Sequence, residues 1–191
     1  MESISKLNRI LVDEKPSDYI LANESYMFNL IPELKRSKGF DQLNPWHPYD
    51  LYEHTLRVVD GVEADYILRM ASLFHDLGKP DVQYIDINGV GHYYNHWAVS
   101  KTIFSRFYRN NCVPDPQKYE SINQLIFFHD IDIDKLTTKE LSSLVHSLGY
   151  DDVIRLFKLK RADLLAQSKE HINKLNDYDR QESMILKKIS K

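Results

Sequence analysis

Apolar residues recur every three to four positions along almost the whole chain of 191 residues, and this spacing constrains the fold more than any other feature. It is the period of an amphipathic helix, whereas a half-buried strand alternates apolar and polar residues. The six glycines and seven prolines fall mostly between the periodic segments. The sequence therefore predicts an all-α fold, with helices near residues 3–13, 17–36, 50–60, 63–77, 97–111, 116–129, 137–147, 150–167 and 169–189.

Three of these helices carry recognisable start signals. Side chains that cap the first turn of a helix, or acidic residues that favour its positive end, stand just before the periodic segments. The expected starts are Ser17 and Asp18, a capping box formed by Thr137-Thr138-Lys139-Glu140, and Asp151 with Asp152.

The segment Val82 to Tyr94 breaks the helical pattern. Two short runs rich in β-branched and aromatic residues flank Asn88-Gly89, the dipeptide most typical of a tight hairpin turn. We therefore expect a small β-hairpin near 82–94, inserted between helices.

The length and the even composition favour one domain. A chain of 191 residues is close to the usual domain size, and no repeat or linker-like segment interrupts it. We expect a single compact helical bundle over 1–191, with a core at about 40–170 and helical extensions at both ends. The polar last segment is expected to lie on the surface or to pack against another subunit, which leaves the oligomeric state open.

Charge and cysteine content exclude several classes of partner. The formal net charge is −3, so no overall positive field favours DNA or an anionic membrane. No apolar run approaches the ~20 residues that a membrane span needs. Cys112 cannot form an internal disulfide, and the first residues lack the apolar core of a signal peptide. These features predict a cytoplasmic protein that binds neither DNA nor membranes.

His75 and Asp76 stand at the end of the most apolar predicted helix. Such a helix belongs in the core, so two ionisable side chains at its end need partners. An imidazole and a carboxylate together suit divalent cations such as Mn, Fe, Co, Ni or Zn, with Mg suited to oxygen-rich positions. The chain turns at Gly78, where both side chains could reach one ion.

Four further polar residues interrupt apolar helical stripes. His54, Asp163 and His129 fall on the inward faces of their predicted helices, and His96 opens the helix that follows the hairpin. A buried carboxylate without a partner costs several kcal/mol or shifts its pKa upward, and a cation removes that penalty. Five helices thus each direct metal-binding side chains toward the interior, which indicates a shared metal site.

Simpler interpretations exist for each residue. A single inward histidine such as His54 or His129 can be a hydrogen-bonded core residue, and Asp163 can pair with Lys160 or Arg161. Most remaining candidates are expected to be structural: His47 in a turn, His146 and His171 on the surface, and Cys112 as a packed or loop thiol. Asp130 either lies at a helix end, or accepts a proton or orients His129. His92 in the hairpin has no clear assignment.

The order of these residues resembles the H…HD…D signature of the HD-domain metal-dependent phosphohydrolases. Longer motifs are similar to the HD portion of bacterial CCA-adding enzymes, the tRNA nucleotidyltransferases, over about residues 40–170. The chain has no room for the nucleotidyltransferase head of those enzymes, so CCA addition is not implied. The motifs are Glu53–Asp60 (EHTLRVVD), Leu73–Pro80 (LFHDLGKP), Tyr94–His96 (YNH), Phe127–Asp130 (FFHD) and Lys160–Leu165 (KRADLL).

The resemblance implies a helical HD fold and one or two divalent metal ions (Mn, Fe, Ni, Co, Zn or Mg). It implies that the first ion is held by His54, His75, Asp76 and Asp163. His96 and His129 match histidines that bind a second ion, with Asp76 as the bridge, or that bind phosphate or order water instead.

The resemblance also implies a phosphatase or phosphodiesterase that acts on a small phosphoester. Nucleoside monophosphates and 2′,3′-cyclic nucleotides are the expected substrates. Asp76 and Lys79 are the expected catalytic residues, with Lys79 either contacting phosphate or lying solvated at a helix end. Tyr93, Tyr94 and Trp97 could stack a base, or belong to the core. The alternative is a non-catalytic module that binds a metal or a nucleotide and has an RNA or protein partner.

Overall fold

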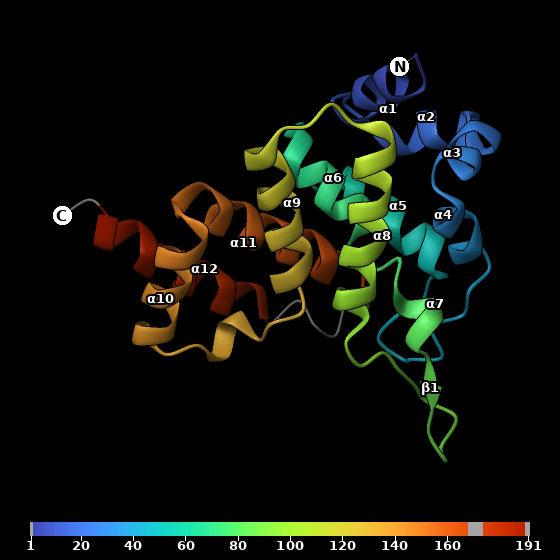
Figure 1. Cartoon of the computed structure of the whole chain (residues 1–191). Coiled ribbons are helices and arrows are strands. Elements are labelled where there is room, and N and C mark those ends of the chain that lie inside the picture. Colours follow the sequence, from blue (N-terminus) through green and yellow to red (C-terminus); the bar gives the residue numbers. More distant parts are fainter. Residues whose placement is uncertain (1, 168–173, 190–191) are drawn as a thin grey trace.

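The computed structural model describes residues 2–167 and 174–189, which form helices with one small hairpin, as the sequence predicts (Figure 1). In chain order the elements are α1 (Glu2–Leu11), α2 (Pro16–Ala22), α3 (Glu24–Leu30), α4 (Pro32–Ser37), α5 (Leu51–Asp60), α6 (Tyr66–Phe74), α7 (Lys79–Val82), β1 (Tyr84–Ile85), β2 (Gly91–His92), α8 (His96–Asn111), α9 (Pro116–Phe128), the 3-10 helix η1 (Ile133–Lys135), α10 (Thr138–Leu148), α11 (Tyr150–Leu165) and α12 (Lys174–Ile189).

Helix α6 is the centre of the core. It packs against α5, α8, α9 and α11, and its residues from Leu68 to Phe74 are all buried. A short helix that is apolar nearly all round gains most from such complete burial. The C-terminal end of α6 therefore delivers His75 and Asp76 into the interior. Within the described ranges, no helix combines the length and the hydropathy that a bilayer crossing requires.

The single helix predicted over 17–36 is wrong, because the segment forms the three short helices α2, α3 and α4. Asn23 separates α2 from α3, and its N–H bonds to the carbonyl of Ile20. Pro32 begins α4, since proline lacks the N–H that a helix interior needs and disfavours helical geometry at the residue before it. Ile31 accordingly lies outside the helical region, with φ −131° and ψ 85°.

The predicted helix start at Ser17 and Asp18 is also wrong. Lys15 is the N-cap and Pro16 the first helical residue, a position that suits the fixed φ of proline. Ser17 instead donates from its backbone N–H and its hydroxyl to the carboxylate of Asp60, at the end of α5. The polar side chain therefore joins α2 to α5 and does not cap its own helix.

The capping box at the start of α10 is confirmed. The Thr137 hydroxyl accepts from the N–H of Glu140, and the Glu140 carboxylate accepts from the N–H of Thr137. Helix α11 starts at Tyr150, one residue before the predicted acidic pair, and Gly149 precedes it with φ +78°. Asp151 and Asp152 thus occupy the first turn, where negative charge favours the helix dipole.

The hairpin projects from the helical body (Figure 1). Its strands pair Tyr84 with His92 and Ile85 with Gly91, so they are shorter than the sequence pattern suggests. Gly89 in the turn has φ +79°, as the Asn-Gly dipeptide predicts. The Asp86 carboxylate accepts the N–H groups of Asn88 and Val90 at 2.8 and 3.0 Å, which fixes the turn.

The C-terminal helix α12 packs against α11 and η1. Tyr178 is buried in this contact, and Arg161 of α11 forms ion pairs with Asp179 and Glu182. The predicted helix began at 169, and residues 168–173 lie outside the described part of the chain. The described part of the segment therefore packs on its own chain.

Arg69 joins the N-terminal segment to the core. Although its side chain is charged, it is almost fully buried, with 2% of its surface exposed. The guanidinium donates to the carbonyls of Leu11 at 2.9 Å, Val62 at 3.3 Å and Asp13. Carbonyl groups at the end of α1 and in the loops that follow α1 and α5 therefore obtain their donors from the central helix.

We expect Arg69→Met to lower the free energy of unfolding by about 2–4 kcal/mol, because several buried carbonyls lose their donor. Urea unfolding monitored by circular dichroism measures the change. The control is Arg106→Met, which removes an arginine paired with Glu33 at the surface and is expected to cost less than about 1 kcal/mol. Equal effects of the two substitutions would contradict this account of Arg69.

Asp65 links the two helices that lead to the candidate site. As the N-cap of α6 it accepts the Leu68 N–H at 3.0 Å, and its other oxygen accepts Arg155 Nε of α11 at 2.9 Å. Burial alone would raise the pKa of Asp65, but these two hydrogen bonds outweigh it and lower the pKa. The ionised carboxylate therefore stabilises the fold.

We expect Asp65→Asn to destabilise the protein by roughly 1 kcal/mol near pH 7, since asparagine still caps the helix but loses the ion pair. A lowered pKa stabilises the folded state above the unfolded pKa, about 3.9, and this contribution is lost as the pH falls through the folded pKa. The difference in the free energy of unfolding between wild type and variant should therefore shrink toward about pH 3. Urea unfolding at several pH values tests this, and a constant difference would contradict it.

Candidate metal centre

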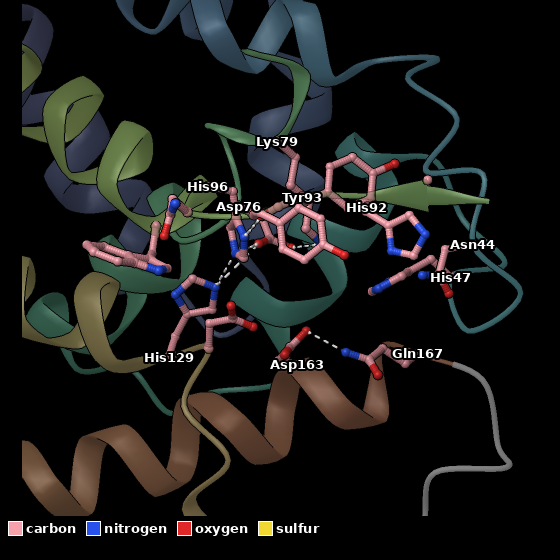
Figure 2. A pocket seen from close by; sticks show the side chains of 15 residues that line it. Asn44, His47, Asp76, Lys79, His92, Tyr93, His96, His129, Asp163 and Gln167 are labelled. Carbon is pink, nitrogen blue, oxygen red and sulfur yellow. Dashed lines mark hydrogen bonds and ion pairs between the residues drawn. The ribbon is translucent and has the colours of Figure 1, made fainter. Parts of the chain in front are cut away.

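The structure brings together six of the residues that the sequence singled out. They come from five segments that are distant in the chain, and they face one interior region where several helices end. Figure 2 shows Asp76, His96, His129 and Asp163 directed toward the same cavity. The full set is His54 on α5, His75 and Asp76 after α6, His96 at the start of α8, His129 at the end of α9, and Asp163 on α11.

The first cluster contains His54, His75, Asp76 and Asp163, whose ligand atoms all lie within 4.8 Å of one another. His54 Nε2 is 3.1 Å from Asp163 Oδ1 and 3.5 Å from Asp76 Oδ2. His75 Nε2 is 3.2 Å from Asp76 Oδ2. His54, His75 and Asp76 are buried, whereas the side chain of Asp163 is 21% exposed. Asp163 therefore stands at the open side of the cluster.

These nitrogens approach the carboxylates without bonding to them. Among the described residues, Nε2 of His54 and Nε2 of His75 have no hydrogen-bond partner despite the short distances, because the alignment is wrong. Buried polar atoms without partners are costly and rare. Imidazole nitrogens that lack partners of their own and face carboxylate oxygens across one space suit a cation. These buried groups could hold a metal ion.

The second cluster contains Asp76, His96 and His129. Asp76 Oδ1 is 3.1 Å from His96 Nε2 and 3.4 Å from His129 Nε2, and the two Nε2 atoms are 3.0 Å apart. Asp76 thus belongs to both clusters, with Oδ2 facing the first and Oδ1 facing the second.

Backbone carbonyls orient three of the imidazoles. Nδ1 of His75 lies 2.7 Å from the Ser72 carbonyl, and Nδ1 of His129 lies 2.7 Å from the Ile126 carbonyl. Nδ1 of His96 makes the same contact with Tyr93 at 2.8 Å. A carbonyl only accepts, so each Nδ1 carries the proton and each Nε2 presents a lone pair, as in metal-binding histidines. The facing Nε2 atoms of His96 and His129 then need a cation or a proton between them.

Helix ends explain why these residues converge. His75 and His129 are the C-cap residues of α6 and α9, and their rings satisfy carbonyls of the last turn that lack helical partners. His96 begins α8 directly after Asn95, whose φ of +60° is tolerated better by asparagine than by most residues. Each of these three histidines thus stands at one end of a helix and directs its free nitrogen inward.

Gly78 allows the two parts of the second cluster to approach. A Cβ at this position would lie 2.4 Å from the His96 carbonyl and 2.7 Å from the Ser100 nitrogen. The Gly78 N–H donates to the Ser100 hydroxyl at 2.9 Å. The turn that carries Asp76 therefore lies directly against the start of α8, where a larger residue does not fit.

Lys79 is buried and not solvated, with 6% of its surface exposed. Its ammonium group lies 2.7 Å from Asp76 Oδ2 and donates to Gln42 Oε1 at 2.9 Å. Burial alone would raise the pKa of Asp76, but the charges of His75 and Lys79 outweigh it and hold the pKa well below its usual range. Asp76 is therefore ionised, the state that binds a cation.

The pKa values of the other cluster residues are shifted in different directions. Burial would raise the pKa of Asp163, but the ring of His54, whose Nε2 lies 3.1 Å from Asp163 Oδ1, lowers it. Burial lowers the pKa of His129, and the neighbouring histidines add to this effect. Burial also acts to lower the pKa of His75, but the charge of Asp76 outweighs it and raises that pKa. A proton and a cation therefore compete for Nε2 of His75.

His47 was interpreted as a turn residue, and the structure places it at the site. Its ring centroid lies 5.3 Å from that of His54, and it lines the same cavity. Burial, with the charge of Lys79, lowers its pKa to about 3, so its ring is neutral. His47 lies in the loop before α5, where periodicity carries no information. Gln42, which contacts Lys79, was missed for the same reason. Gln167, which contacts Asp163, was placed in the predicted helix 150–167 and not considered as a site residue, whereas α11 ends at Leu165.

The alternatives raised for single residues are now decided. Asp163 does not pair with Arg161, which binds α12, or with Lys160, which donates to the His129 carbonyl at 2.6 Å. His146 is exposed, as predicted, and His171 lies outside the described residues. His92 pairs with Asp86 at 2.9 Å. Cys112 is half-buried, as expected for a packed or loop thiol, and burial raises its pKa.

A cavity of about 520 Å³ opens beside the two clusters, within the range of small-molecule sites. Its lining is rich in histidine, acidic and aromatic side chains. The lining residues are Asn44, His47, Asp76, Lys79, Gly91, His92, Tyr93, Tyr94, Asn95, His96, Trp97, His129, Asp130, Asp163 and Gln167.

Comparison with models of known protein families gives no match to this chain. The search of curated proteins also returns no similar sequence. The geometry of the site is therefore the basis for the functional conclusions below.

We expect chelator-treated protein to bind a divalent cation such as Mn²⁺ or Ni²⁺ and to unfold at a higher temperature when the cation is present, because only the folded state holds the ligands together. Asp76→Asn should weaken binding about 100-fold or more, since both clusters lose their shared carboxylate. Calorimetric titration and thermal unfolding measure the two effects.

The matched control is His146→Gln, which removes an exposed histidine of α10. It should leave the affinity unchanged. Wild-type protein that binds none of these cations, or an Asp76→Asn variant that is folded and binds them as tightly, would contradict the assignment of the clusters.

Proposed function

We propose that this protein is a metal-dependent phosphohydrolase, a phosphodiesterase or phosphatase that acts on a nucleotide or another small phosphoester. The observation that carries the proposal is the position of Asp76, whose two carboxylate oxygens face two separate groups of metal-type ligands beside an open cavity. Two adjacent cation positions that share a carboxylate suit phosphoryl transfer, where the attacking and the departing oxygen both need stabilisation.

The donor set supports a catalytic site over a purely structural one. Structural metal sites are closed by four protein ligands, whereas catalytic sites keep positions open. The second cluster offers three protein ligands, and Asp163, the partly exposed ligand of the first cluster, lines the cavity. Imidazole and carboxylate together favour Mn, Fe, Co, Ni or Zn, and Mg is also compatible with the carboxylates.

A bound divalent cation would supply Lewis acidity toward a phosphoryl oxygen and make hydroxide available from water near neutral pH. His54, His75, Asp76 and Asp163 would hold the first ion, and Asp76, His96 and His129 the second. Lys79 places a buried positive charge at the cavity wall, where it favours a phosphate group that enters. Asp130 is exposed at the cavity and available to accept a proton.

The sequence motifs add independent support, since their order resembles that of HD-domain phosphohydrolases. That likeness favours nucleoside monophosphates and 2′,3′-cyclic nucleotides as substrates. The competing function is a module that binds a metal or a nucleotide without turnover and has an RNA or protein partner.

We expect hydrolysis of at least one member of a panel of 2′,3′-cyclic nucleotides and 2′-, 3′- and 5′-nucleoside monophosphates when Mn²⁺, Ni²⁺, Co²⁺ or Mg²⁺ is added. Chelation should abolish the release of phosphate or the opening of the cyclic ester. Asp76→Asn should lower kcat/KM by about 1,000-fold or more, because both ions lose a ligand.

The His146→Gln variant again serves as the control and should retain full activity. Protein that binds metal but turns over no member of the panel would refute the enzyme and favour the binding module. Activity that survives both chelation and Asp76→Asn would show that another site is responsible.

A further inference from the structure

Three aromatic side chains, Tyr93, Tyr94 and Trp97, line the cavity, and they differ in their contacts with the rest of the protein. The Tyr93 hydroxyl donates to the Gln42 carbonyl and accepts from Gln83. The Trp97 ring packs edge-on against Phe127, with centroids 4.4 Å apart. Tyr94 lines the same cavity but is 69% exposed. A large aromatic surface at the rim of a cavity is more typical of a binding surface than of a core.

The Tyr94 ring is supported from one side. It lies parallel to the ring of His92, with 1° between the planes and 5.8 Å between the centroids, an offset stack. His92 is held in turn by Asp86, 2.9 Å away, and Asp86 is fixed by the N–H groups of the hairpin turn. The hairpin thus orients His92, His92 supports one face of Tyr94, and the high exposure of Tyr94 leaves ring surface free for a ligand.

The position of Tyr94 relative to the clusters suits a ligand with two different ends. Tyr94 precedes the cluster residue His96 by two positions, and both line one cavity of about 520 Å³. A nucleoside phosphate carries a flat base at one end and an anionic phosphate at the other. Its phosphate belongs near the clusters and Lys79, whereas its base requires an aromatic or polar surface nearby.

We propose that Tyr94, supported by His92, is a stacking platform for the base of a nucleoside phosphate whose phosphate group lies at the metal clusters. This inference rests on the proposed function for the position of the phosphate, and it narrows the substrate class from phosphoesters to nucleotides. Stacking recognises the flat face that all bases share, so the platform selects for a base without selecting strongly among bases.

The test compares ligands with and without a base. Adenosine 5′-monophosphate and ribose 5-phosphate share the sugar and the phosphate but differ in the base. We expect Tyr94→Ala to raise the dissociation constant of metal-loaded protein for adenosine 5′-monophosphate about 5- to 100-fold, the range of one base stacked on one aromatic ring. The constant for ribose 5-phosphate should stay unchanged, and Tyr94→Phe should bind both ligands like wild type.

The matched control is Tyr19→Ala, which removes a tyrosine of α2 that is 50% exposed and does not line this cavity. It should leave the dissociation constants of both ligands unchanged. A trinucleotide with a terminal phosphate completes the panel, since the end of an RNA presents the same base and phosphate. Dependence on Tyr94 for either the mononucleotide or the trinucleotide supports the platform.

Calorimetric titration gives the dissociation constants, and KM gives a second measure for any ligand that is turned over. Two outcomes would overturn the platform: Tyr94→Ala weakens the binding of adenosine 5′-monophosphate and of ribose 5-phosphate equally, or it weakens the binding of neither adenosine 5′-monophosphate nor the trinucleotide. Because binding is measured without turnover, this outcome differs from failure of the enzyme proposal, in which no ligand is hydrolysed.

Discussion

The carboxylate of Asp76 is the interaction on which the rest of this site depends. It is buried at the centre of the molecule, where a negative charge without compensation is strongly unfavourable. The surrounding groups compensate for it: Lys79 and His75 supply charge, and His96 and His129 direct nitrogen atoms at its second oxygen. Each of these residues stands at a helix end or in the turn after one, so the helices must meet at this point.

The site places polar and charged side chains inside a core that is otherwise apolar. The same helix termini that leave carbonyl groups without partners also carry the imidazoles that satisfy them, as His75 and His129 do for α6 and α9. The remaining ring nitrogens then face one another and the carboxylates. Nε2 of His54 and Nε2 of His75 lack hydrogen-bond partners among the described residues, and a cation is the simplest group that satisfies both.

Much of this arrangement follows from local pattern. The all-α fold, the hairpin with Gly89 at its turn, the capping box at Thr137 and the inward positions of the six cluster residues were all predicted. The division of 17–36 into three helices was missed, because the prediction followed the apolar period across Pro32, although proline disfavours helical geometry at the residue before it. Asn23 is only a weak signal, since asparagine is moderately unfavourable in a helix. Loop residues such as His47 were missed because no periodicity governs where a loop side chain points.

The sequence by itself determined which residues are apolar and which polar residues share a helical face with them. Those polar residues are therefore buried together with the apolar ones. The period of the apolar residues depends on neighbours within a few positions, so that information is local. Only the tertiary structure decided that Asp76 serves both clusters, that Lys79 is buried against it, and that Tyr94 stands at the rim of the cavity. These features depend on distances between segments far apart in the chain, which are set by how the helices pack.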